Sequence, residues 1–291
     1  MKVCAFFSAP SPIREPLADI LQNQTNMPEF NFNDLIQDIA DRKKRLAEKR
    51  FSTQEKNENP REVYLSVCKN IADYYEQYGF KYSASGQHMT LKTKGSEFIY
   101  KISFSSSHYN IADENVAITV SANVLSHKFK KWQSENKIGH FNEVPSEYVG
   151  GGQIGNLQEN STWLKWNVAN PLTRHTETEN IIENINKFAI PFFNLFSDIP
   201  PLIHTIKECG SFYGISDVTS LTEFLMYAST KENVEATLKR FLSSKNIWKE
   251  YLEVLEKLRN KEKISGGQYW NSIAKLTIEL ELDLTENKNI S

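Results

Sequence analysis

The 291-residue sequence has few cysteines and no long apolar run, and each absence argues against a class of protein. Its three cysteines, Cys4, Cys68 and Cys209, are far apart and form no Cys-x-x-Cys pair, which argues against a disulfide framework or a zinc knuckle. No apolar run reaches the length of about 18 residues that a membrane-spanning helix needs. Residues 1–10 carry one positive charge and a short apolar stretch without a convincing cleavage region. We therefore predict a reduced cytoplasmic protein that does not associate with membranes.

The sequence also lacks an excess of charge of either sign. It has 34 Lys and Arg residues against 36 Asp and Glu residues, for a formal net charge of -2, which argues against a dominant nucleic-acid-binding tail. Hydrophobic residues make up 40% and charged residues 24%, as in an average globular protein, so the chain is not expected to be disordered, collagen-like or a coiled-coil rod. The length allows one large domain or two small ones.

Motifs of catalysis and metal binding are missing as well. The glycine-rich run at residues 150–155 continues with Asn156 and Leu157, whereas a phosphate-binding P-loop ends in Gly-Lys-Ser/Thr, so we predict a turn or the start of a strand there. None of the six histidines falls in an HxxxH, HExxH or HxH pattern. His108 and His175 have polar neighbours but no partner that the sequence identifies. We predict no catalytic residue, no metal ligand and no cofactor.

Periodicity indicates both helices and strands. Helical spacing predicts helices over residues 33–51 and 60–78, the second capped by Asn59 and ended by Gly79. Alternation predicts strands over residues 88–93, 97–105, 116–124 and 163–168, and the short links between the first three favour antiparallel pairing. A long helix over residues 177–196 contains Pro191, which must kink or interrupt it. Further helical stretches lie between residues 202 and 260.

The C-terminal tail alternates between leucine or isoleucine and polar residues from Lys275 to Leu284. This period of two favours a strand, although the spacing of Leu276, Leu280 and Leu284 also suits a helix. In a strand, Glu279, Glu281 and Asp283 would form an acidic ridge. Such a ridge could occupy the basic groove of a partner, or it could simply protect an edge strand from aggregation.

These elements predict an α+β fold with an antiparallel sheet of about four to five strands flanked by helices, followed by a helical C-terminal half. We divide the chain into an N-terminal arm with a charged helix (residues 1–59), an α+β domain (residues 60–208) and a helical C-terminal region that ends in a strand (residues 209–291).

Part of the α+β domain has a distinctive series of features. They are a helix that ends in Tyr78-Gly79-Phe80-Lys81, the strands at residues 98–104 and 118–120, the segment at residues 152–157 and the tryptophan strand at residues 163–166. With these features, residues 60–185 resemble a bacterial family of domains of unknown function, number 4304 in that series. The resemblance implies an α+β domain, often found among bacterial conflict and toxin-immunity genes, without an assigned active site. It implies no catalytic residues.

We favour a non-enzymatic protein-binding module, because no active site is evident, aromatic residues reach 12% and the resemblance leads to immunity or defence components. The partner would be a toxin or a defence-complex subunit. The alternative is a nucleic-acid-binding protein that uses a basic helix at residues 42–50 and the tryptophan strand, although such a helix face is also an ordinary solvated surface. A third class is an enzyme whose residues converge only in the fold. The candidate partner-binding residues are Arg42, Arg45, Lys49, Trp163, Glu279, Glu281 and Asp283.

Overall fold

A computed structural model of the chain describes residues 58–136, 144–158, 160–264 and 266–285, which form two compact units. The first, here called the sheet unit, combines the described residues up to Val124 with Gly151–Ser197. The second, the helical unit, combines the described residues of Leu125–Gly150 with those from Asp198 onward. Each unit is thus made of two separate stretches of the chain.

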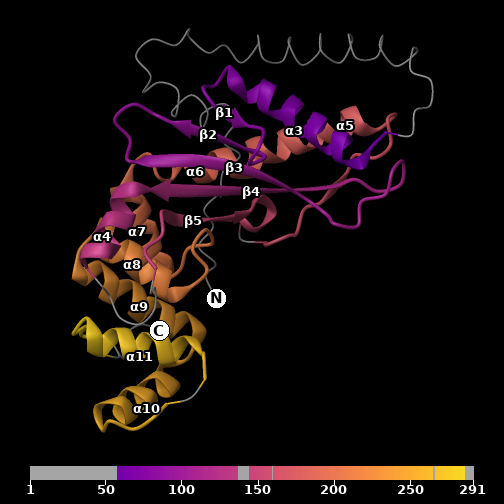
Figure 1. Cartoon of the computed structure of the whole chain (residues 1–291). Coiled ribbons are helices and arrows are strands. Elements are labelled where there is room, and N and C mark those ends of the chain that lie inside the picture. Colours follow the sequence, from indigo (N-terminus) through magenta and orange to yellow (C-terminus); the bar gives the residue numbers. More distant parts are fainter. Residues whose placement is uncertain (1–57, 137–143, 159, 265, 286–291) are drawn as a thin grey trace. The chain divides into compact units, whose positions relative to one another are not determined.

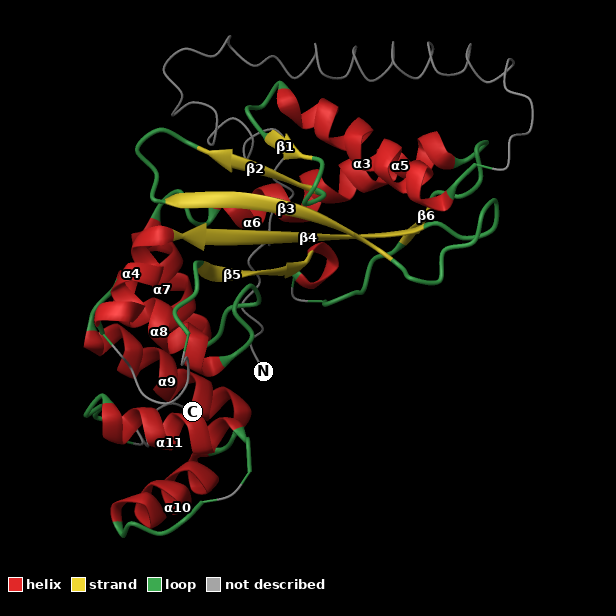
Figure 2. Cartoon of the chain, in the orientation of Figure 1, coloured by secondary structure: helices red, strands yellow, loops and turns green. Residues whose placement is uncertain are grey.

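Six strands form one antiparallel sheet, whereas the sequence predicts about four to five; the alternation does not predict the strands at residues 81–83 and 148–153 (Figure 2). The strand order is β1-β2-β3-β4-β5, and the short β6 also pairs with β4. In the central pair, Met89 lies opposite Ile102 and Leu91 opposite Tyr100, all four buried on one face. The predicted α+β class is confirmed, as is the helical C-terminal half. The strands are β1 (Lys81–Ser83), β2 (His88–Lys92), β3 (Phe98–Ser106), β4 (Ala117–Ser126), β5 (Tyr148–Gln153) and β6 (Trp166–Asn167).

Helix α3 (Pro60–Glu76) agrees closely with its prediction. The Asn59 side chain accepts a hydrogen bond of 2.9 Å from the Arg61 backbone N–H, and Pro60 occupies the first turn, where its missing N–H costs nothing. The apolar stripe of the helix, from Val63 to Tyr75, is buried. The chain then turns at Gly79, whose φ of +85° favours glycine.

The predicted long helix is divided around Pro191. It consists of α5 (Arg174–Asn184), a π-helical turn (Ile185–Ala189) and α6 (Ile190–Asn194). Proline cannot donate to the preceding turn and crowds its carbonyls, which accounts for the widened turn just before it. The Tyr75 hydroxyl of α3 donates to the carbonyl oxygen of Ile182 (3.2 Å) and to Asn186 Oδ1 (2.7 Å), and so ties the two helices together at this turn.

Aromatic packing joins α6 and the turn that follows it to the buried face of the sheet. The ring centroids of Tyr100 and Phe193 are 4.9 Å apart, and those of Phe98 and Phe196 are 5.5 Å apart. In Figure 1, α6 lies behind β3, on the covered side of the sheet. The opposite face carries the alternate, partly exposed side chains of β3, so the sheet unit has one apolar layer between strands and helices.

The helical unit contains α4 (His127–Glu135), α7 (Ile199–Cys209), α8 (Val218–Ala228), α9 (Lys231–Lys245), α10 (Trp248–Arg259) and α11 (Tyr269–Glu279). Aromatic rings pack α4 against α8, with Phe129 5.3 Å and Trp132 5.8 Å from the Tyr227 ring. At the C-terminal end, the Tyr251 hydroxyl of α10 lies 3.2 Å from Thr277 Oγ1 of α11. None of the described helices is both long enough and apolar enough to cross a bilayer.

The predicted C-terminal strand is wrong, because residues 269–279 form helix α11. The helical face made by Ile273, Ala274 and Leu276 is buried, while Ile278 is exposed on the other side. This outward isoleucine produced the alternation that resembled a strand. Leucines four residues apart fit one face of a helix as well as they fit one face of a strand. The burial of residues at helical spacing therefore decides in favour of the helix.

The acidic ridge predicted on that strand is therefore absent. Glu279 ends α11, and Glu281 occupies a turn with a φ of +51°. The backbone N–H of Asp283 donates to Glu235 Oε1 of α9 at 2.8 Å. Because these acidic residues belong to a helix end, a turn and an irregular tail, they do not share one strand face.

Candidate functional site

The candidate residues from the sequence analysis do not gather into one site. Arg42, Arg45 and Lys49 lie outside the described residues, and so does the charged helix predicted for them. The tryptophan strand is much shorter than predicted, since β6 contains only Trp166 and Asn167. Trp166 is buried against the sheet, whereas Trp163 lies in the preceding loop with 67% of its surface exposed.

The described residues include no evident metal site, and the thiol of Cys68 is buried. Within the part of the chain that the structure describes, no three His, Cys, Asp or Glu side chains are placed to hold a metal ion together. Cys68 is buried in α3, and this burial raises the pKa of its thiol to about 12. The thiol therefore stays protonated and unreactive near neutral pH, as expected of a structural cysteine.

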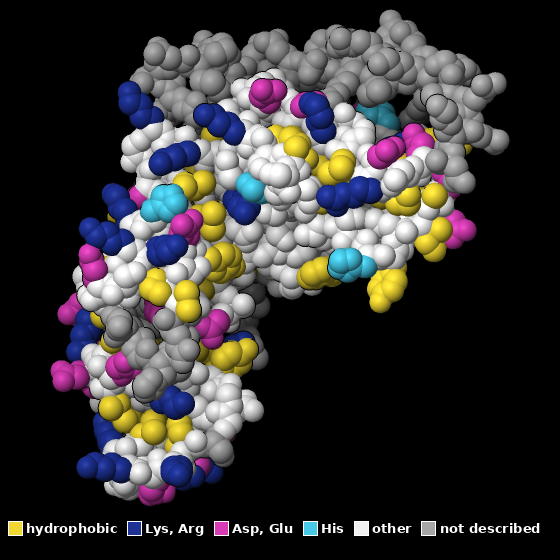
Figure 3. Space-filling model, viewed as in Figure 1, with side chains coloured by type: hydrophobic (Ala, Val, Ile, Leu, Met, Phe, Trp, Pro, Cys, Tyr) yellow, Lys and Arg dark blue, Asp and Glu magenta, His cyan; other side chains and the backbone are white. Residues whose placement is uncertain are grey.

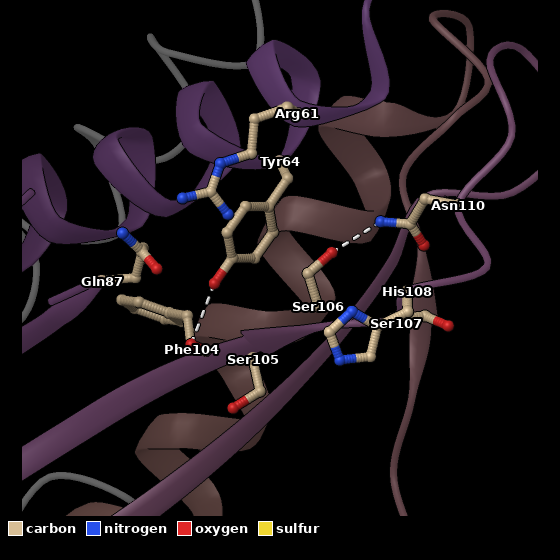
Figure 4. A pocket seen from close by; sticks show the side chains of 9 residues that line it. All are labelled: Arg61, Tyr64, Gln87, Phe104, Ser105, Ser106, Ser107, His108 and Asn110. Carbon is tan, nitrogen blue, oxygen red and sulfur yellow. Dashed lines mark hydrogen bonds between the residues drawn. The ribbon is translucent and has the colours of Figure 1, made fainter. Parts of the chain in front are cut away.

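The sheet unit contains a cavity of about 410 Å³ between the first turn of α3, the β1–β2 turn and the end of β3 (Figure 4). Its lining is mostly polar, with hydroxyl, amide, imidazole and guanidinium groups. The lining residues are Arg61, Tyr64, Gln87, Phe104, Ser105, Ser106, Ser107, His108 and Asn110.

The cavity exists because β3 continues past the beginning of β2. The pairing of these strands begins with His88 opposite Ser103, and the last bond on this side joins the Phe104 N–H to the Gln87 carbonyl oxygen at 2.9 Å. The Tyr64 hydroxyl of α3 then takes the place of a neighbouring strand, donating to the Phe104 carbonyl oxygen at 2.9 Å. Tyr64 is only 1% exposed, and burial raises the pKa of its hydroxyl well above the ordinary value, so the phenol remains a neutral donor.

The loop between β3 and β4, residues 107–116, forms one side of the cavity and is held by its own hydrogen bonds. Ile111 and Asn115 exchange backbone bonds of 2.8 and 3.0 Å. The Asn110 side chain bridges the two strand ends: its Nδ2 donates to Ser106 Oγ at 2.6 Å and its Oδ1 accepts from the Ala117 N–H at 3.0 Å. The loop therefore has a fixed conformation although its tip is open to solvent.

Large apolar side chains project from this loop and from the loop between β6 and α5. Tyr109 is 84% exposed and Ile111 is 54% exposed, and Leu172, just before α5, is 70% exposed. We call these three side chains the loop-end surface. Three hydrogen bonds join this loop to residues 167–168, which lead to Leu172. Asn167 Nδ2 donates to the Glu114 carbonyl oxygen at 2.8 Å, the Val116 N–H donates to Asn167 Oδ1 at 2.9 Å, and the Val168 N–H donates to the Val116 carbonyl oxygen at 2.9 Å. Figure 3 shows hydrophobic side chains in yellow at the corresponding end of the sheet unit.

The partly exposed face of the sheet is polar, unlike the apolar loop-end surface. The six described strands contain no aspartate or glutamate. Lys81 and Lys101 flank Thr90 across three neighbouring strands, and His88 lies next to Ser103. Lysine and histidine side chains, blue and cyan, are scattered over this face in Figure 3. The face therefore combines hydroxyl groups with positive charge.

Comparisons of the chain with protein-family models, with curated proteins and with solved structures found no match. The resemblance of residues 60–185 to the bacterial family therefore stays a prediction.

Proposed function

We propose that the protein is a non-catalytic binding module of the cytoplasm that recognises a partner protein through the loop-end surface. The observation that supports this proposal is the exposure of Tyr109, Ile111 and Leu172 on two loops joined by hydrogen bonds. Contiguous exposed apolar patches are typical of interaction surfaces, and Tyr109 and Ile111 lie two residues apart in one loop.

The rigidity of the loop favours recognition. A surface that is already ordered loses less conformational entropy when a partner binds, so more of the contact energy appears as affinity. Tyrosine is also among the residues that most often dominate the binding energy of interfaces. Tyr109 is the most exposed large apolar side chain described, and the Asn115 amide donates to its carbonyl oxygen at 3.3 Å.

The narrower proposal is that the partner is a toxin or another subunit of a bacterial defence complex. It depends on the predicted family resemblance, and the identity of the captured partner tests it directly. A partner with no toxic activity and no role in defence would remove this narrower proposal while leaving the protein-binding proposal in place.

Replacing Tyr109 and Ile111 together with serine is expected to weaken partner binding at least about 100-fold, because truncation of a central interface residue costs 2 kcal/mol or more. The full chain would capture its partner from native cells. The partner would then be purified, and its affinity for both forms of the chain measured by titration calorimetry.

A matched control replaces Leu252 and Ile278 with serine, since these side chains are also partly exposed, at 42% and 45%, but belong to the helical unit. We expect this control to bind like the original chain. Equal loss in both variants, or no loss in the Tyr109/Ile111 variant, would contradict the assignment of the loop-end surface.

The second candidate function is binding of nucleic acid, which the acid-free sheet face favours. Lys92 and Lys101 lie on neighbouring strands of this face, and lysines bind phosphates with an affinity that falls steeply with salt. If this candidate is correct, changing both lysines to glutamine should weaken binding of a single-stranded oligonucleotide about tenfold at low salt and flatten its salt dependence. Absence of oligonucleotide binding to the full chain at low salt, in a fluorescence anisotropy titration, would remove the candidate.

A further inference from the structure

We propose that the cavity between α3 and the end of β3 binds the phosphate group of a small phosphorylated molecule. This inference does not depend on partner-protein binding, because the cavity is lined by polar groups and lies beside the apolar loop-end surface. It depends on the supply of hydrogen-bond donors, on the lack of competing carboxylates and on the size of the cavity.

Among the lining residues, Arg61 is the only arginine or lysine. Among the residues that the structure describes, no carboxylate forms an ion pair with it and none lines the cavity. Its guanidinium carbon lies 5.5 Å from the centre of the Tyr64 ring, so the plane of the side chain is supported from one side. A guanidinium has five N–H donors in a fork that matches the oxygens of phosphate, and no acceptors.

Ser106 supplies a second, oriented donor. The Ala117 N–H fixes the oxygen of the Asn110 amide, so the other end of that amide must donate to Ser106 Oγ, which it does at 2.6 Å. A hydroxyl that accepts this bond keeps its own hydrogen for a ligand. Because backbone directions alternate along a strand, the Ser106 N–H also points to the side of β3 where Phe104 meets Gln87, which is the side of the cavity.

Figure 4 shows how these groups are arranged. Arg61 and Gln87 lie on one side of the Tyr64 ring, Ser106 and Asn110 lie on the other, and the His108 ring lies in front. The guanidinium, the hydroxyl and the imidazole line the same cavity, and the oxygens of a phosphate monoester can accept from each of these donors.

The size of the cavity favours a phosphorylated molecule over free phosphate. A volume of about 410 Å³ falls in the usual range of small-molecule sites and exceeds what a single phosphate fills. The Tyr64 ring is itself only 1% exposed, so it supports Arg61 and is not a surface for the ligand. Phenyl phosphate is a simple phosphate monoester that fills more of this volume than free phosphate, and it serves as the probe.

The test measures binding of phenyl phosphate to the full chain by calorimetry and by broadening of its phosphorus resonance. We expect a dissociation constant of about 1 mM or below, and at least a tenfold increase in Arg61→Gln, which corresponds to about 1.4 kcal/mol. Ser106→Ala should weaken binding by a smaller factor. Benzoate, which replaces the phosphate by a carboxylate on the same ring, should bind more weakly than phenyl phosphate.

The matched control is Arg259→Gln, which removes the same charge from an exposed position of α10 in the helical unit. It should bind phenyl phosphate like the original chain. Equal weakening in both arginine variants would show only a general charge effect and would overturn the proposal. So would unchanged binding in Arg61→Gln, benzoate binding as tight as that of phenyl phosphate, or no binding of phenyl phosphate at about 20 mM. None of these results bears on partner-protein binding, so the two proposals can fail separately.

Discussion

Replacing Phe193 with alanine is expected to destabilise the sheet unit by about 3–5 kcal/mol, the usual cost of removing a large aromatic side chain from a packed core. Phe193 is fully buried in α6, with its ring 4.9 Å from that of Tyr100 and 6.0 Å from that of Phe192. Its removal leaves a cavity between the sheet and the π-interrupted helix, which can close only if α6 moves. Urea unfolding followed by circular dichroism measures the loss.

The control for this variant is Leu172→Ala in the same unit. Leu172 is 70% exposed, so its truncation should change the free energy of unfolding by less than about 0.5 kcal/mol. Similar losses in the two variants would show that α6 does not pack on the sheet as described. Leu172→Ala has a second use, because a loss of partner binding without a loss of stability separates the loop-end surface from the core.

Most of the sheet unit could be predicted from sequence because its layers leave clear periodic patterns. The buried and exposed residues of β3 alternate strictly, since one face of the strand meets α6 and the other is partly open. Two local sequence signals mark the start of α3, namely an asparagine cap and a proline in the first turn. Where local preference and burial agree in this way, sequence alone identifies an element.

The tail shows why the prediction failed elsewhere. Between Leu276 and Leu284 the sequence fits a period of two and a period of four, and only the packing of α11 decides between them. Ile278 is an apolar residue on the exposed face of α11, and no local sequence pattern indicates that it is exposed. The length of β6 also depends on tertiary structure, because its two residues form a strand only by pairing with Ala117 and Ile118 of β4.

The candidate site was only partly visible in the sequence. The polar run from Ser105 to His108 and the loop that follows it can be recognised, but nothing in them indicates a cavity. Arg61 reaches the same place from a helix, and this convergence depends on β3 continuing beyond β2. The exposure of Tyr109 and Ile111 is likewise tertiary information, since alternating apolar residues are as often buried as exposed. The available signal was the pair of large apolar residues, Tyr109 and Ile111, in the link between the strands predicted at residues 97–105 and 116–124.

A substitution of Gly151 by alanine is expected to destabilise the sheet unit by about 3 kcal/mol or more, for two separate reasons. Gly151 lies in β5 with a φ of +140°, a conformation that residues with a side chain rarely adopt. In addition, a β-carbon there would collide with the carbonyl oxygen of Ala122 and lie 2.7 Å from the Cα of Asn123. The glycine run thus serves the close approach of β5 to the β4 backbone, and its role is structural. Thermal and urea unfolding would measure the effect.

Gly152→Ala separates the two causes. Gly152 also has a positive φ, of +157°, but no atom lies within 4 Å of the position that a β-carbon would take. Its substitution should therefore cost only the conformational strain, about 1 kcal/mol, and the difference between the two variants measures the collision with β4. If both glycines cost the same, the close approach of the strands does not explain the glycine run. A loss confined to Gly151 would instead show that the glycine run is required for the close packing of β5 on β4.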